Sequence, residues 1–127
     1  MRYLGIDYGT RRVGLAISDE GGKIAFPEQT LTNNKDLISK VASFCQKKDI
    51  KKVIIGESRD YSGQPNEIMK AAEEFSVALE KATGLEVIKE PEFLTSHQAS
   101  KIQGGSNQID ASAASIILQS YLDKMKN

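Results

Sequence analysis

Acidic residues recur where predicted strands and one predicted helix meet loops. Asp7 and Glu57 each end a short apolar run, Glu90 and Glu92 close another, and Asp110 opens the last helical pattern. In open α/β sheets, ligands gather outside the carboxyl ends of the strands. Carboxylates that converge on one point repel each other unless a cation lies between them. The spacing therefore predicts a shared site that binds a metal ion.

Hard oxygen ligands favour Mg²⁺ or Mn²⁺. Two such ions, about 3.5 to 4 Å apart, can clamp the attacking and leaving oxygens of a phosphodiester. We therefore predict that Asp7, Asp110 and either Glu57 or Glu92 are both catalytic residues and metal ligands. Each acid also has a structural interpretation: Asp7 would satisfy turn N–H groups, Asp110 would cap a helix, and the glutamates would be solvated loop residues.

The residues after Asp7 form a turn suited to phosphate. A tight glycine turn, a hydroxyl and two adjacent cations can face phosphate oxygens, although so short a match also occurs in ordinary hairpins. Further cations lie near the other predicted strand-end loops. The residues predicted to contact substrate are Gly9, Thr10, Arg11, Arg12, Arg59 and Lys101.

The apolar patterns predict the elements that would position these residues. Strands are expected within residues 3–6, 13–17, 23–32, 52–56 and 86–90, and helices over 37–45, 65–83, 95–102 and from 110 onward. Three antiparallel strands that lead into parallel α/β units give an α/β fold. Its mixed five-stranded sheet has the first three strands antiparallel, the first, fourth and fifth parallel, and helices on both faces.

The helical patterns also predict particular positions. Asn33 and Asn34 are the expected N-caps of the first helix, and Cys45 on its apolar side is expected in the core. The last helix is expected to bury one stripe, formed by Ala113, Ile116, Ile117, Tyr121 and Met125.

Composition limits the kind of protein. A length of 127 residues favours a single domain over 1–127, and 17 basic against 17 acidic side chains give no general attraction to polyanions. One cysteine excludes an internal disulfide and favours a reducing compartment. Because we find no apolar leader and no apolar run long enough to span a membrane, we expect a cytoplasmic protein without a membrane partner.

Taken together, the motifs resemble the YqgF family, also called RuvX. The resemblance rests on motifs spread along the chain: 7–10 with Arg12 and Gly14, 53–56, Gly63, 92–96, 110–113 and 116–121. It implies an RNase H-like fold and a metal-dependent endonuclease with Asp7, Glu92 and Asp110 as its acids. The implied task is trimming the 5′ end of pre-16S ribosomal RNA. Ribosomal particles are a possible partner, and we expect a monomer or weak homodimer.

The chain departs from the family pattern beside Glu92. Pro91 and Phe93 stand where the family usually has Asp and Arg, so one acid and one cation are missing. Glu57 follows the fourth strand where the family usually has Leu, and it could supply a replacement ligand.

Three other functions stay open. An older proposal for the family is resolution of Holliday junctions in DNA, and the departures at Pro91 and Phe93 fit an RNA-binding ribosome-assembly factor with weakened catalysis. The turn after Asp7 also resembles the phosphate loop of actin-like and sugar-kinase-like ATP-binding domains. Those proteins clamp nucleotide between two lobes, for which this chain is too short.

Overall fold

The computed structural model describes residues 1–57, 67–91 and 107–125. Its sheet has the order β3-β2-β1-β4-β5, with β1, β2 and β3 antiparallel and β1, β4 and β5 parallel. This is the predicted mixed sheet. The strands are β1 (Arg2–Tyr8), β2 (Arg12–Ser18), β3 (Ala25–Thr32), β4 (Ile50–Glu57) and β5 (Glu86–Pro91), and the helices are α1 (Leu37–Lys47), α2 (Glu67–Thr83) and α4 (Asn107–Met125).

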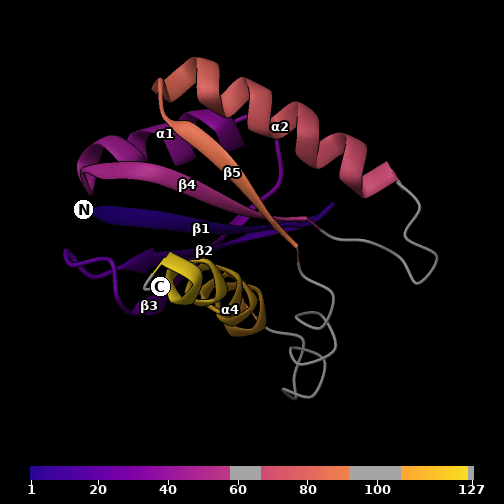
Figure 1. Cartoon of the computed structure of the whole chain (residues 1–127). Helices are drawn as coiled ribbons and strands as arrows, with labels where there is room; N and C mark the ends of the chain where they lie inside the picture. The colour runs from indigo at the N-terminus through magenta and orange to yellow at the C-terminus, as the bar shows by residue number, and fades with distance from the viewer. Residues whose placement is uncertain (58–66, 92–106, 126–127) are drawn as a thin grey trace.

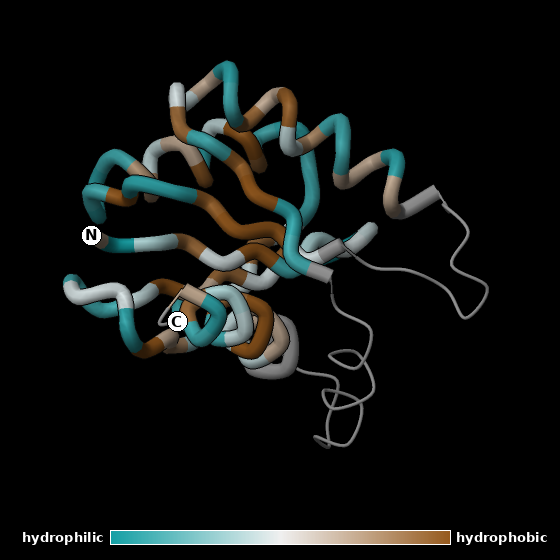
Figure 2. Tube along the Cα trace, viewed as in Figure 1, coloured by the Kyte–Doolittle hydropathy of each residue, from teal (hydrophilic) through white to brown (hydrophobic). Residues whose placement is uncertain are grey.

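Helices cover both faces of the sheet: α1 and α2 lie on one side and α4 on the other (Figure 1). Side chains alternate between the faces along each strand. In β1, Leu4 and Ile6 are buried beneath α1 and α2, and in β4 Ile54 is buried beneath α4. Apolar residues concentrate in the central strands and on the inner sides of the helices (Figure 2), so the sheet is the centre of two apolar layers.

Gly5 lets α4 pack directly on β1. A Cβ at this position would lie 2.7 Å from Cβ of Leu118 and 2.9 Å from the carbonyl oxygen of Ala114, closer than atoms can approach. Two residues earlier in the strand, the ring of Tyr3 meets that of Tyr121, with centroids 6.1 Å apart. The helix therefore runs antiparallel to β1, and its first turn lies toward the carboxyl end of that strand.

The predicted stripe of the last helix is wrong in part. Ala113 and Ile117 are buried, as predicted, but Met125 is 55% exposed. The other buried residues of this helix, which the predicted stripe omits, are Ala111, Ala114, Leu118 and Leu122. Apolar residues occur on nearly every side of this helix, so periodicity alone does not single out the face that contacts the sheet.

The predicted caps of the first helix are also wrong. Asp36 is the N-cap of α1, and its side chain makes no capping hydrogen bond. Asn34 accepts a hydrogen bond from the backbone N–H of Asp36 at 3.0 Å, which forms a turn before the helix instead.

The predicted helix over 95–102 lies outside the described residues. Of the helices that are described, none is long and apolar enough to cross a bilayer.

Cys45 belongs to the core, as predicted, and should be chemically inert. It is 3% exposed, and burial raises the pKa of its thiol to about 11. Because the thiolate is the reactive form, we expect Ellman's reagent at pH 8 to leave the folded protein unmodified. One thiol per chain should react after unfolding in guanidinium chloride, and rapid labelling of the native protein would contradict this placement.

Candidate active site

Asp7 lies on the face of the sheet that α4 covers. The Cβ position of Gly5 and the side chain of Asp7 lie on the same face because strand residues alternate, and Asp7 is half-buried. Asp7 pairs with Gly14 on β2. On β4, Ile55 pairs with Ile6, so the next residue, Gly56, lies beside Asp7. Glycine therefore flanks Asp7 on both neighbouring strands, so these two strand positions place no side chain beside the carboxylate.

The first turn of α4 reaches the level of Asp7. Gly5 touches the helix at Ala114, and Asp7 lies two strand residues farther on, about 6.6 Å along β1. Asp110 precedes Ala114 by four helical residues, or about 6 Å of rise, in the same direction. The backbone of Asp110 thus lies near the strand end that carries Asp7. Asp110 is the fourth residue of α4, so its interpretation as an N-cap is wrong.

The turn between β1 and β2 is tight and is held by the residue that follows β3. A Cβ on Gly9 would lie 2.5 Å from the carbonyl oxygen of Arg12, so only glycine fits there. The side-chain amide of Asn33 donates to the carbonyl oxygen of Gly9 at 2.7 Å, and its backbone N–H donates to that of Arg11 at 2.8 Å. Thr10, Arg11 and Arg12 are exposed on this braced turn.

Several predicted site residues are described only in part or not at all. Glu57 is the last residue of β4, and its backbone pairs with Pro91 of β5. The side chains of Glu57 and Asp110 lie outside the described part of the structure. Glu92, Arg59 and Lys101 lie wholly outside it, so their roles stay predictions.

Glu90 lies in the same row as Asp7 but has a different environment. It pairs with Gly56 and faces α4, and it is 3% exposed. Its Oε2 accepts hydrogen bonds from the hydroxyl of Ser120 at 2.9 Å and from Nζ of Lys124 at 2.6 Å. The carboxylate of Glu90 therefore bonds to other side chains of the protein and is shielded from solvent.

The donor set at this edge suits a hard divalent cation. Asp7 offers carboxylate oxygens next to two glycines, and Asp110 lies on the neighbouring helical turn. Among the described side chains, no three His, Cys, Asp or Glu groups lie close enough together to hold a metal ion. The side chains of the predicted ligands Glu57, Glu92 and Asp110 lie outside this described set, so their part in a metal centre stays a prediction.

Comparison with known proteins identifies the family. The family model RuvX, described as Holliday junction resolvase, matches residues 1–124. This chain belongs to the RuvX family. A protein of Rickettsia akari named "Putative pre-16S rRNA nuclease" is 37% identical over 138 residues, covering 98% of this chain and 87% of the relative. A Lachnospira eligens protein of the same name is 33% identical and covers 97% of both chains.

Solved structures support the fold of this RuvX protein. RuvC of Thermus thermophilus, determined in complex with a Holliday junction substrate, superimposes with a TM-score of 0.67 at 16% identity and covers 100% of this chain and 97% of RuvC. The fowlpox virus resolvase, solved with Holliday junction DNA, gives a TM-score of 0.61 at 13% identity and covers 100% of both chains. The predicted RNase H-like fold is confirmed, and nucleases of this group generally depend on divalent metal ions.

Proposed function

We propose that this RuvX protein is a metal-dependent nuclease that hydrolyses phosphodiester bonds in structured nucleic acid. Its proposed substrate is the 5′ end of pre-16S ribosomal RNA. The observation that carries the proposal is the position of Asp7, between two glycines and level with the first turn of α4. The names of its relatives supply the substrate.

In this proposal, Asp7, Asp110 and either Glu57 or Glu92 hold Mg²⁺ or Mn²⁺. When bound, such ions polarise the scissile phosphate and provide a nucleophile from water near neutral pH. The braced turn binds the phosphate backbone: Thr10 can donate its hydroxyl, and the exposed cations of Arg11 and Arg12 attract the polyanion.

Two other activities have support. The family description and the resolvase structures favour DNA junctions as a second substrate. Pro91 and Phe93, which replace an acid and a cation of the family pattern, favour RNA binding with weak catalysis. The cytoplasmic location, the single domain and the monomeric or weakly dimeric state stay predictions.

One experiment separates the three activities. The protein is incubated with Mn²⁺ and either a pre-16S RNA carrying its 5′ extension or a four-way DNA junction, with EDTA-treated samples as controls. We expect metal-dependent cleavage of the RNA at a defined 5′ position. Cleavage of the junction alone would replace our proposal with a resolvase, and tight binding of RNA that stays intact would replace it with an assembly factor.

A further inference from the structure

An ion pair between a buried carboxylate and an exposed lysine joins β5 to α4. The carboxylate side chain of Glu90 is only 4% exposed, whereas its partner Lys124 is 62% exposed and reaches inward to bind it at 2.6 Å. The hydroxyl of Ser120 provides a second donor to the same oxygen. A buried carboxylate without partners is very costly, so these two donors hold β5 and α4 together at this point.

The two joined elements are those that lead to the candidate metal ligands. Glu90 is two residues before Glu92 in the chain, and Ser120 and Lys124 belong to the helix whose first turn contains Asp110. Glu90 also lies in the strand row of Asp7, with only Gly56 between them. Any shift of α4 relative to β5 would therefore move the backbone of Asp110 relative to the strand row that contains Asp7.

We infer that Glu90 is a positioning residue for the metal site, acting through Ser120 and Lys124 to hold α4 in register with β5. The inference rests on the proposed function, because that proposal assigns Asp7 and Asp110 to the metal. Groups that orient metal ligands typically contribute about 10- to 100-fold to metal affinity. Removing such a group should therefore change the metal affinity measurably, even though the metal ligands themselves are unchanged.

The test removes one charge of the ion pair at a time and keeps the size of the side chain similar. Glu90→Gln can still accept from Ser120 but loses the ion pair, and Lys124→Met removes the cation. Mn²⁺ affinity is measured by electron paramagnetic resonance, and the Mn²⁺ concentration that gives half-maximal cleavage is measured on the same samples. We expect both quantities to shift by about 10-fold or more in each variant. The double variant should be no worse than either single one, because both remove the same interaction.

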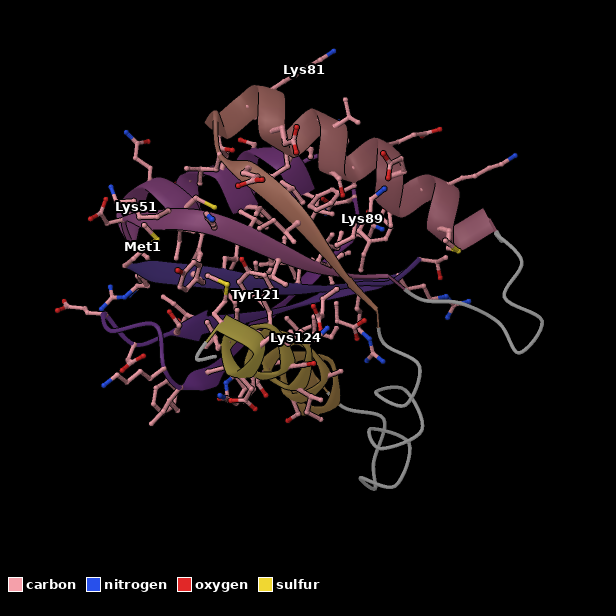
Figure 3. The ribbon with its side chains drawn as sticks, viewed as in Figure 1. Met1, Lys51, Lys81, Lys89, Tyr121 and Lys124 are labelled. Atoms are coloured by element: carbon pink, nitrogen blue, oxygen red, sulfur yellow. The ribbon has the colours of Figure 1, made fainter. Side chains whose placement is uncertain are left out.

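Two control variants separate positioning from lost stability. Lys89 is the residue before Glu90, and it pairs with Glu73 of α2 on the other side of the sheet (Figure 3). Lys89→Met removes an ion pair of the same strand without touching α4, so its Mn²⁺ affinity should equal that of the wild type. Val41→Ala leaves a cavity beneath α1, and it should lower the unfolding temperature without changing the Mn²⁺ requirement.

The outcomes are distinct. Wild-type Mn²⁺ affinity in Glu90→Gln and Lys124→Met would overturn the inference and leave the proposed function intact. An equal loss of affinity in Val41→Ala would also overturn it, because general destabilisation would then be the cause. A wild-type protein that neither binds Mn²⁺ nor cleaves would remove the proposed function and, with it, the role of Glu90.

Discussion

Replacing Asp7 with Asn is expected to reduce metal-dependent cleavage by at least about 10²- to 10³-fold, the range seen when one group that stabilises transition-state charge is removed. The amide has nearly the same shape as the carboxylate, so the fold should be unchanged. It lacks the negative charge that a hard cation requires, and Mn²⁺ binding should weaken together with kcat/KM. The measurements are single-turnover cleavage rates and Mn²⁺ titrations.

Asp36→Asn is the matched control for this substitution. Asp36 is exposed at the start of α1, and its side chain makes no capping hydrogen bond. The chemical change is identical, but we expect wild-type cleavage and metal affinity. An Asp7→Asn variant that cleaves as fast as Asp36→Asn would show that the carboxylate of Asp7 has no part in the reaction.

Gly5→Ala is expected to produce the largest loss of stability, about 1–3 kcal/mol in the free energy of unfolding. The added Cβ would lie 2.7 Å from Leu118 Cβ and 2.9 Å from a backbone carbonyl of α4. The carbonyl cannot rotate away, so the whole helix must move outward. Because α4 also carries Asp110, the Mn²⁺ requirement for cleavage should rise as well. Urea unfolding and Mn²⁺ titration measure the two effects.

Gly21→Ala controls for the effect of replacing a glycine as such. Its Cβ would make an ordinary contact, 3.5 Å from Oδ2 of Asp19, in an exposed turn. We expect a change within about 0.5 kcal/mol. If Gly5→Ala were as stable as Gly21→Ala, the close packing of α4 on β1 would be wrong.

The sheet could be predicted because its signals are local. Short apolar runs separated by turn residues indicate the strands, and two tight turns allow only an antiparallel start before the first helix. Asp7 could be chosen as a candidate for the same reason, since a strand end followed by Gly9 and Thr10 is visible in ten consecutive residues.

The interactions around the site could not be predicted because they join distant parts of the chain. Asn33 binds Gly9 across 24 residues, and Glu90 binds Lys124 across 34, with no pattern that pairs them. Asn33 is a good helix cap by type, so local preference pointed to the wrong role. The buried face of α4 was partly missed because Gly5, which selects that face, lies more than 100 residues earlier in the sequence.

The central claim is that Asp7 and Asp110 bind a common divalent ion, and a crystal structure grown with Mn²⁺ tests it most directly. Anomalous scattering would locate the ion independently of the protein atoms. We predict an ion at the carboxyl end of β1 with oxygen ligands from both residues and at least one of Glu57 and Glu92. An ion bound elsewhere, or carboxylates of Asp7 and Asp110 that share no ion at saturating Mn²⁺, would contradict the account.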